Sequence, residues 1–385
     1  MFSDLIRPYQ GEDESSFAKR KAYFLRLVAT RLEFHNEDIN TFKRVNVIPL
    51  DASEIEEIDG FWSHYLPCNL RERLIDKDYY GFYKKVKKDN ELLVHYLPDM
   101  FYQAFIDEYF TNPQHSRPFD DKNQYDLYFH DVYRPKTIFR KLRNQYLDSD
   151  YNFISQEQAI KLAKNNGEVI LKIAKFSCGG KGILFWNGEN KNDEELLKFL
   201  NQSDRVICQN VIKQHAELNR LNPSSVNTIR VMTLMFKDKV HVLSGVLRMG
   251  VNGSRVDNAS SGGIICGIMP DGRLKNVAYN PSGNQFFKHP QGTAFDSVSI
   301  PNYSQCIDLA VTLAKRLSSV TRQISWDFAI DESGQPILIE FNVTWGQLDF
   351  HQLCNGPIFG DLTHEVLDEV FQNSYTLKSI LKSLK

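Results

Sequence analysis

The chain has 385 residues, of which 42% are hydrophobic and 12% aromatic, so it can bury a sizeable core and we expect more than one domain. Its 46 basic and 48 acidic residues give a net charge of −2. Because nucleic-acid-binding proteins usually carry a marked positive charge, this balance argues against that class of function.

The six cysteines contain no C-x-x-C pair, so neither a structural zinc site nor a disulfide framework is expected. Reduced thiols are typical of the cytoplasm. No apolar run approaches the ~20 residues that a membrane span needs, and the first residues lack the basic-then-apolar order of a signal peptide. We therefore expect a soluble cytoplasmic protein, of an oligomeric state that the sequence leaves open.

The N-terminal third has helical patterns. Residues 17–34 carry apolar positions at helical spacing and a basic opposite face. Such a helix either covers its own domain or lies on an anionic membrane surface, so a peripheral membrane contact stays open. Residues 53–115 contain many aromatic side chains, which can pack a core or stack on sugar rings. Pro113 and Pro118 mark a junction, and we predict a helical, aromatic-rich domain over residues 1–118.

A strand, a glycine-rich loop and a second strand are predicted over residues 168–186, after a helix that Ser155 caps. Lys172 lies inside the first, apolar strand, where an unpaired ammonium is unfavourable, so an anionic group should meet it. The glycines of residues 177–182 would let backbone N–H groups approach a phosphate closely, although the spacing is not that of a Walker A loop. The alternative is an ordinary hairpin turn beside an edge lysine.

Two arginines lie on a pair of long strands joined by a tight charged turn. Arg230 stands among apolar residues of the first strand, and Arg248 ends the second. A guanidinium in such a place favours a bidentate carboxylate or phosphate, so Arg230 either holds a substrate or pairs with a neighbouring acid such as Asp327 or Glu340. The Ser- and Gly-rich residues 258–263 can form an anion-binding nest or a flexible surface loop.

A hairpin of two apolar runs is predicted over residues 325–342, after an amphipathic helix over residues 303–320. Glu340 and Asn342 are two residues apart and therefore share one face of their strand, which Asp327 can reach from the facing strand. Two carboxylates and an amide oxygen are the donors that Mg²⁺ prefers when it also holds nucleotide phosphates. The alternative is a solvated hairpin face with ordinary surface acids. A closing amphipathic helix is expected over the C-terminal tail.

The motif of Asp327 followed by Glu340-Phe341-Asn342 resembles the metal-binding end of the ATP-grasp superfamily, an Asp followed by E-x-N. The runs NTIRVMTL and DNASSGGIICGI, with the letters WGQ and HQ after Asn342, resemble the sugar-transfer associated ATP-grasp proteins, which occur with polysaccharide biosynthesis. The resemblance runs from about residue 60 to the C-terminus.

This resemblance implies an α+β ATP-grasp fold, in which two α+β subdomains clamp ATP, preceded here by the helical domain. The ATP-grasp domain would cover residues 119–385. Its nucleotide lid would lie over about residues 135–208, and its metal and substrate subdomain over about residues 209–385.

The resemblance also implies roles for single residues. Mg²⁺ would bind to Asp327, Glu340 and Asn342. The ATP-binding residues would be two phosphate-binding lysines, the glycine flap and the hinge beside adenine: Lys122, Lys172, Ser177, Gly179, Gly180, Gln209, Asn210, Val211 and Ile212. The chain departs from the family in two of these places, because relatives often have an acid at Gln209 and a proline at Ile173.

In such enzymes ATP phosphorylates a substrate carboxylate, and an amine then attacks the acyl-phosphate to leave an amide. Relatives have an arginine where this chain has Ser325, so we expect Arg230 or Arg248 to supply the missing charge. Gly346 and Gln347 are expected to offer hydrogen-bond donors to the developing oxyanion.

The predicted function is therefore an ATP-dependent carboxylate–amine ligase. The resemblance implies that it joins an amino acid or amine to a sugar acid, nucleotide-sugar or glycan in polysaccharide or capsule biosynthesis. Two other classes stay open: a kinase that phosphorylates a hydroxyl from the same ATP site, and a glycan-binding module without chemistry. The presence of Lys172, Asp327 and Glu340 argues against the module, and nothing in the sequence excludes the kinase.

Overall fold

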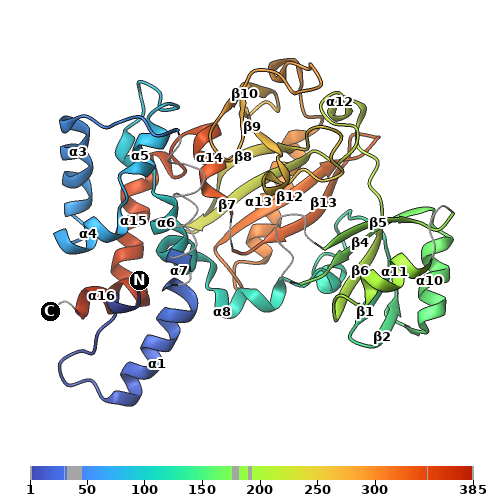
Figure 1. The fold of residues 1–385 in the computed structure, drawn as a ribbon, viewed down its shortest axis with the longest axis horizontal. Helices are drawn as coiled ribbons and strands as arrows, with labels where there is room; N and C mark the ends of the chain where they lie inside the picture. Colours follow the sequence, from blue (N-terminus) through green and yellow to red (C-terminus); the bar gives the residue numbers. More distant parts are fainter. Residues whose placement is uncertain are drawn as a thin grey trace.

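The computed structural model describes residues 2–29, 31–32, 46–175, 182–189, 193–344 and 346–383. Three units follow one another across the molecule: a helical unit at one end, a seven-stranded sheet in the middle and a six-stranded sheet at the other end (Figure 1). Within the described ranges, no helix is both long and apolar enough to cross a membrane.

The helical unit is built from short helices of the N-terminal third. They are α1 (Glu14–Phe24), α3 (Ala52–Ser63), α4 (Cys68–Leu74), α5 (Asp78–Tyr83), α6 (Asp99–Phe101), α7 (Glu108–Thr111) and α8 (Pro113–Ser116), with a π-helical segment at Tyr102–Asp107. Helix α3 begins at a capping box, in which Asp51 and Glu54 each accept the other's backbone N–H. Trp62 and Phe101 are fully buried, with ring centroids 4.8 Å apart. Most aromatic residues of this unit therefore pack in its core and are not placed to stack on sugar rings.

The C-terminal tail differs from the prediction in two respects. It forms two helices rather than one, α15 (Thr363–Asn373) and α16 (Tyr375–Lys382), because Ser374 ends the first and caps the second through Leu377 N–H. Their apolar side chains lie in the same core as the N-terminal helices, and both chain ends lie in this unit (Figure 1). Residues 363–382 therefore belong to the helical unit, whereas the predicted division assigned them to the ATP-grasp domain.

The six-stranded sheet is antiparallel, in the order β3-β2-β1-β6-β4-β5. Its strands are β1 (Thr137–Leu142), β2 (Gln145–Asp148), β3 (Phe153–Ile154), β4 (Glu168–Ile173), β5 (Ile183–Asn187) and β6 (Arg205–Asn210). Helices α10 (Gln156–Lys164) and α11 (Asp193–Leu200) pack on one face of it. The predicted cap of α10 is confirmed, since Ser155 forms a capping box with Gln158.

The seven-stranded sheet is also antiparallel, in the order β11-β10-β9-β8-β7-β12-β13. Its strands are β7 (Thr228–Phe236), β8 (Lys239–Met249), β9 (Ile264–Ile268), β10 (Leu274–Tyr279), β11 (Gln285–Phe286), β12 (Gln323–Ile330) and β13 (Pro336–Asn342). The tight turn between β7 and β8 is confirmed: Lys237 and Asp238 both have positive φ, 48° and 58°. Short α12 (Ala216–Asn219) precedes β7.

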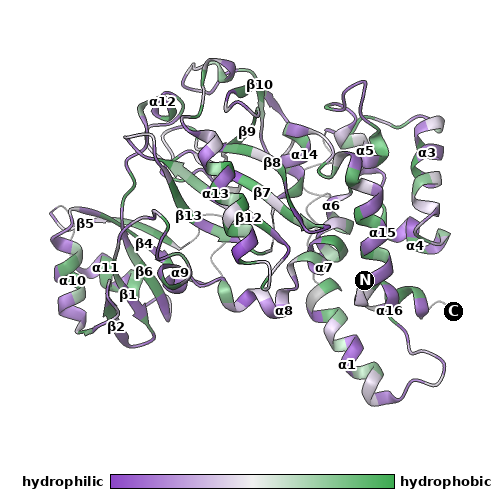
Figure 2. Cartoon of the chain, turned by 180° about the vertical axis from the view of Figure 1, so that it is seen from behind, coloured by the Kyte–Doolittle hydropathy of each residue, from purple (hydrophilic) through white to green (hydrophobic). Residues whose placement is uncertain are grey.

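The two faces of this sheet have different covers. Helix α13 (Tyr303–Arg316) packs on one face, where the alternate residues of the central strands are apolar (Figure 2). Helix α14 (Leu348–Asn355) and part of the helical unit pack on the other face. Arg230, Asp327 and Glu340 are register partners on adjacent strands, and they belong to this second face.

The stretch from Asp121 to the start of β1, which includes short α9 (Tyr125–Tyr128), contacts both sheets. Lys122 N–H donates to the carbonyl of Ala174, just after β4, at 2.9 Å. Tyr125 Oη donates to the carbonyl of Phe341 on β13 at 3.3 Å. The segment therefore holds the ends of β4 and β13 close to each other, and the predicted site lies between them.

Candidate active site

The hairpin of β12 and β13 has the register that the sequence predicts. Asp327 lies opposite Glu340, and Ser325 lies opposite Asn342. A register shift follows Asp327, but it comes after these pairs and leaves them on one face. The three predicted metal ligands are thus brought together on two rigid strands.

Asp327 is fully buried and is held by an arginine of the neighbouring strand. Arg230 donates from Nε and Nη2 to its two carboxylate oxygens, at 2.8 and 2.7 Å. The sequence left open whether Arg230 holds a substrate or pairs with a neighbouring acid, and the structure shows the pair with Asp327. The third guanidinium nitrogen, Nη1, donates to Gln347 Oε1 at 2.5 Å. Gln347 thus acts here as an acceptor that orients Arg230.

Arg248 adds a second guanidinium to the same place. Its Nη2 lies 3.6 Å from Asp327 Oδ2, and its Nε lies 3.3 Å from Asp257 Oδ2. Arg248 is 6% exposed, so both ion pairs lie largely away from water. Asp257 is the first residue of the run DNASSGGIICGI but was not predicted as a site residue, because nothing in that run indicates which charged group it meets. Only the fold brings it to Arg248.

Glu340 joins the two sheets electrostatically. Its Oε2 lies 3.1 Å from Nζ of Lys122, and the ammonium of Lys172 acts on it from β4. Burial opposes the ionisation of this carboxyl, but the two lysines and Arg248 outweigh burial and lower its pKa to about 2. Glu340 is therefore ionised at any physiological pH.

Lys172 lies on the face of β4 opposite to helices α10 and α11, since Val169 and Leu171 fill the core on the other side. Burial lowers its pKa to about 8, with the charges of Lys122 and Arg134 acting in the same direction and Glu340 against them. The ammonium is partly desolvated there, so an anionic ligand would stabilise it. The flap that follows it in sequence, with Ser177, Gly179 and Gly180, lies outside the described residues.

The predicted metal ligands can be tested against the donors that they present. Among the described residues, no group of three or more His, Cys, Asp or Glu side chains could hold a metal ion. The set here is two carboxylates and an amide. Asn342 Nδ2 donates to Asp327 Oδ2 and to the Ser325 carbonyl, each at 3.4 Å. The amide oxygen of Asn342 can therefore coordinate a cation. These oxygen atoms suit a hard cation, which Glu340 and Asn342 could bind. Asp327 could also bind it, although both of its carboxylate oxygens already accept from Arg230.

The predicted adenine hinge is the end of β6 and the residues after it. Gln209 is buried, and its Nε2 donates to the Pro135 carbonyl at 3.3 Å, so this side chain fastens the start of β1. Asn210 N–H donates to the carbonyl of Lys136. Val211 and Ile212 follow the strand and are partly exposed. The chain then contacts the hairpin of β12 and β13, where His215 N–H donates to the Ile330 carbonyl at 2.9 Å.

Gly346 packs closely against two buried side chains. A Cβ there would lie 2.7 Å from Met232 Cε and 2.8 Å from Ser325 Oγ. Ser325 is buried and carries no charge, so the positive charge near the hairpin comes from β7 and β8, as the sequence suggested. Residue 345, just before Gly346, lies outside the described residues.

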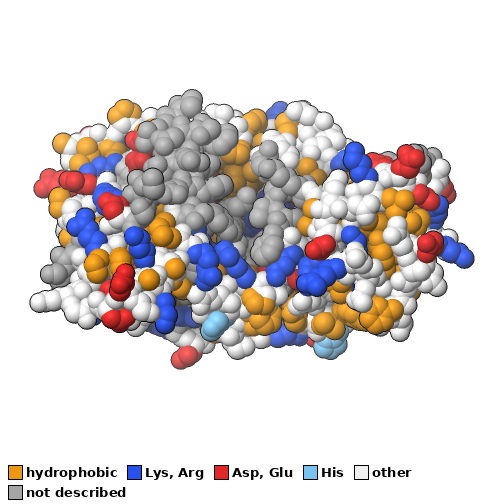
Figure 3. Space-filling view, turned by 60° about the horizontal axis from the view of Figure 1, so that its bottom comes forward, with side chains coloured by type: hydrophobic (Ala, Val, Ile, Leu, Met, Phe, Trp, Pro, Cys, Tyr) orange, Lys and Arg blue, Asp and Glu red, His pale blue; other side chains and the backbone are white. Residues whose placement is uncertain are grey.

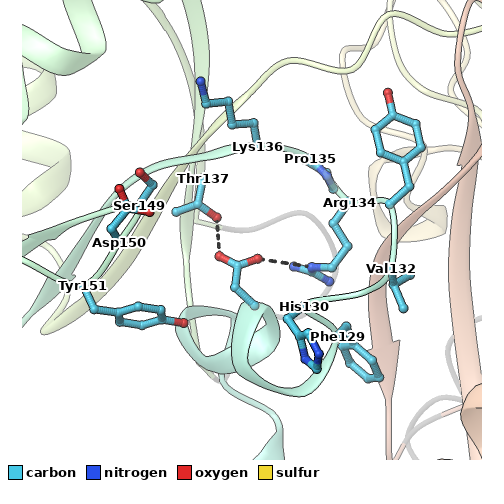
Figure 4. Close-up of a pocket in the computed structure, with 12 residues that line it drawn as sticks. Phe129, His130, Val132, Arg134, Pro135, Lys136, Thr137, Ser149, Asp150 and Tyr151 are labelled. Atoms are coloured by element: carbon cyan, nitrogen blue, oxygen red, sulfur yellow. Dashed lines mark hydrogen bonds and ion pairs between the residues drawn. The ribbon is translucent and has the colours of Figure 1, made fainter.

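A separate pocket of about 540 Å³ lies beside the start of β1 (Figure 4). Asp126 lines it and bonds to Thr137 and Arg134. Tyr151 points into it from the turn after β2 (Figure 4). None of the predicted catalytic, nucleotide or metal residues lines this pocket, so it is not the site described above.

The sequence also gave no role to the residues of α14. Gln352 exchanges two hydrogen bonds with the backbone of Leu97, each at 2.9 Å, and so fastens the helical unit to α14. His351 is fully buried, and its Nδ1 lies 2.8 Å from Ser244 Oγ. The adjacent letters HQ were part of the resemblance, but nothing in their spacing indicated which side chain would face the sheet.

In this arrangement Lys172 of β4 and Lys122 of the segment before β1 both act on the carboxylate of Glu340 on β13. The model of the family described as "Sugar-transfer associated ATP-grasp" matches residues 103–367, and the chain belongs to that family. Its fold is accordingly the α+β ATP-grasp fold, as the motif Asp327 with Glu340 and Asn342 predicted. No curated protein matches the chain.

Several solved structures are similar to it at low identity. Biotin carboxylase from Campylobacter jejuni is 14% identical, with 68% of this chain and 48% of that chain covered and a TM-score of 0.41. VanG D-Ala:D-Ser ligase from Enterococcus faecalis is 14% identical, with coverages of 66% and 61% and a TM-score of 0.40. L-amino acid ligase from Bacillus licheniformis is 11% identical, with coverages of 68% and 49% and a TM-score of 0.39.

The match spans 45%, 49% and 62% of the lengths of the first three solved chains. At TM-scores below 0.5 these likenesses add nothing to the family match.

Proposed function

We propose that the protein is an ATP-dependent carboxylate–amine ligase that forms an amide through an acyl-phosphate. The proposed substrates are a sugar acid, free or as part of a nucleotide-sugar or glycan, and an amine or amino acid, in polysaccharide or capsule biosynthesis in the cytoplasm. The family description, sugar-transfer associated, supports the glycan context. Lys and Arg side chains gather along the middle of one face of the molecule (Figure 3), which supports anionic substrates despite the net charge of −2.

The observation that carries this proposal is the pair of arginines at the hairpin. Arg230 and Arg248 both reach Asp327, from β7 and β8, and both are more than 90% buried. An acyl-phosphate has its new negative charge beside the carboxyl carbon, so a ligase needs fixed cations there until the amine arrives. Two guanidiniums held by carboxylates are already oriented, and little reorganisation is needed when the charge forms.

On the nucleotide side, Lys172 and Lys122 would bind the phosphates, with the flap of Ser177, Gly179 and Gly180 over them and the hinge from Gln209 to Ile212 beside adenine. The Lys122 ammonium lies 3.1 Å from Glu340, so a small movement would let it contact a phosphate oxygen instead of that carboxylate. Mg²⁺ bound by Glu340, Asn342 and Asp327 would neutralise charge that builds on the phosphates during transfer.

The reaction balances in two steps. A carboxylate oxygen of the substrate attacks the γ-phosphorus, and the bond from that phosphorus to the β–γ bridging oxygen breaks, which releases ADP. The amine nitrogen then attacks the acyl carbon, the bond to the phosphate oxygen breaks, and phosphate leaves with the amine proton. Arg230 and Arg248 would steady the acyl-phosphate, while Gly346 N–H and the Gln347 amide would face the oxyanion of the second step.

Hydroxylamine tests the proposal, because it traps an acyl-phosphate as a hydroxamate. The protein is incubated with MgATP, hydroxylamine and single uronic acids or their nucleotide-sugars, with no amine present. We expect ADP release and hydroxamate for at least one carboxylate. If ADP release needs only a glycan hydroxyl, and that hydroxyl becomes phosphorylated, the protein is a kinase and the ligase proposal is wrong. No ADP release with any acceptor would favour a binding module.

A further inference from the structure

We infer that His351 completes an oxyanion site with Arg230 and Arg248, and that its Nε2–H donates to the carboxylate or phosphoryl oxygen of the substrate. The inference deepens the proposed function and rests on it for the identity of the substrate. His351 is 0% exposed, and within the described part of the chain its Nε2 has no hydrogen-bond partner. Buried polar atoms rarely stay unpaired, because the unpaired state is unfavourable.

The tautomer follows from the hydrogen bonds of Ser244. Its hydroxyl oxygen accepts from Asn355 Nδ2 at 2.8 Å and lies 2.8 Å from His351 Nδ1. The hydroxyl hydrogen needs an acceptor, and among the described residues Nδ1 is the acceptor within hydrogen-bond distance. We therefore assign the imidazole hydrogen to Nε2. The unpaired Nε2 then carries a hydrogen and can donate it to an oxygen atom of a ligand.

The position of the ring points to the two arginines. Gln347, at the start of α14, accepts from Arg230, and His351 lies one helical turn further on. Ser244, Val246 and Arg248 are alternate residues of β8, and Val246 is the register partner of Arg230. Helix α14 thus crosses the sheet from Arg230 to Ser244, with His351 between them on the face that carries both guanidiniums.

The electrostatic surroundings keep the ring neutral. Burial, together with the charges of Arg230 and Arg248, lowers the pKa of His351 to about 3. A neutral imidazole with one N–H, close to two cations, cannot attract another cation. It can add a directed hydrogen bond to an anion that the arginines already attract. A carboxylate oxygen and a phosphoryl oxygen share this chemistry.

Two substitutions separate this role from a structural one. In His351→Asn the amide can keep the bond to Ser244, but nothing occupies the place of Nε2. In His351→Gln the amide nitrogen can reach that place, while the bond to Ser244 is lost. Binding of inorganic phosphate is measured by equilibrium dialysis, with MgADP saturating and at one pH. ADP affinity and thermal unfolding of both variants are the controls.

We expect phosphate affinity to fall on the order of 10- to 100-fold in His351→Asn, the loss of one hydrogen bond to a charged group. His351→Gln should retain most of the affinity, and ADP affinity should not change in either variant. Equal phosphate affinity in wild type and His351→Asn, equal losses in both variants, or no phosphate binding by wild type would each overturn the inference. Uronic acids with a non-hydrolysable ATP analogue form a second arm, which separates carboxylate from phosphate binding.

A measurement on the unmodified protein covers the case in which a variant does not fold. Two-bond ¹H–¹⁵N correlations of the histidine rings report the tautomer, and the signal absent from either folded variant belongs to His351. We expect hydrogen on Nε2, with a downfield shift of that proton when phosphate and MgADP are added. Hydrogen on Nδ1, or no shift, would overturn the inference. The phosphate experiments need no carboxylate substrate, so they can fail or succeed independently of hydroxamate trapping.

Discussion

Arg230 and Asp327 face each other as register partners on β7 and β12, and the guanidinium donates to both carboxylate oxygens, at 2.8 and 2.7 Å. Each side chain fixes the other, because both lie on paired strands and are almost fully buried. The pair couples the residue that the motif marks as a metal ligand to the residue that would steady the acyl-phosphate. Changes at either residue should therefore affect stability and chemistry together.

Removal of Arg230 should be strongly destabilising. Arg230→Ala leaves the buried Asp327 with the more distant Arg248, at 3.6 Å, and the Asn342 amide, at 3.4 Å. Loss of one partner of a buried ion pair typically destabilises by about 3–5 kcal/mol. Arg316→Ala is the matched control, because Arg316 makes an equally bidentate pair with Asp131 on the exposed surface, and it should change stability little. Denaturant unfolding at neutral pH measures both. Similar losses in the two variants would show that burial of the Arg230 pair is not what matters.

Arg230→Lys should separate binding from chemistry in the proposed ligase. A point charge replaces a bidentate fork, so we expect hydroxamate formation to fall by about 10-fold or more while ATP affinity stays within about 3-fold. Trapping kinetics and calorimetry measure the two quantities. Loss of ATP affinity without loss of trapping would place Arg230 on the nucleotide instead.

Glu340→Gln should abolish ADP formation and leave the fold intact. The change removes the charge that faces Lys122 and the proposed cation, and we expect the rate to fall on the order of 10³-fold or more. Glu332→Gln, at the exposed turn of the same hairpin, is the control and should be as active as wild type. Near-normal turnover of a folded Glu340→Gln protein would contradict the metal assignment.

Nucleotide binding should take up a proton at alkaline pH through Lys172. Burial lowers its pKa to about 8 from 10.5, so above pH 8 the empty protein increasingly holds the neutral amine, whereas phosphate favours the ammonium. Affinity for MgADP should therefore fall as pH rises from 7.5 to 9. Calorimetry at pH 8.5 in buffers of different ionisation enthalpy should detect the uptake, and Lys172→Met should remove it. The same uptake in that variant would assign it to another group.

The same pKa predicts the sign of a stability effect in the empty protein. Between about pH 8 and 10.5 the unfolded chain holds a proton on Lys172 that the folded chain has released. The contribution of this residue therefore becomes more favourable to the folded state as pH rises through that window. Unfolding free energies of wild type minus those of Lys172→Met, measured across the window, should rise with pH; a flat or falling difference would contradict the shift.

Gly346→Ala should destabilise the protein, whereas Gly60→Ala should not. The added Cβ would lie 2.7 Å from Met232 Cε and 2.8 Å from Ser325 Oγ, so we expect a loss of about 1–3 kcal/mol and lower activity. Gly60→Ala, in helix α3 with nothing within 4 Å of the added Cβ, should stabilise the protein by about 0.5–1 kcal/mol. Thermal unfolding of the two variants checks the contrast.

The sequence alone determined what local pattern and short spacing can determine. The period-2 alternation of Glu340 and Asn342, the turn before them and the opposite Asp327 fixed a shared face, and the register confirms it. The cap at Ser155 and the strand around Lys172 follow from the same local rules. The motif also led to the family, whose model matches residues 103–367.

Only the tertiary structure decided which distant groups meet. Arg230 had two chemically equal partners in the sequence, an acid or a ligand, and the choice of Asp327 depends on β7 pairing with β12 across 97 positions of chain. The C-terminal helices have ordinary amphipathic patterns, which say that a face is buried but not against which unit. His351 and Asp257 stand in runs that resemble the family, but those runs do not indicate which groups the two side chains meet. Only the packing of α14 and of the loop after β8 on one face of the sheet brings His351 to Ser244 and Asp257 to Arg248. Hydrophobic period fixes the face of an element, while its partner is set by long-range packing that no short window of sequence contains.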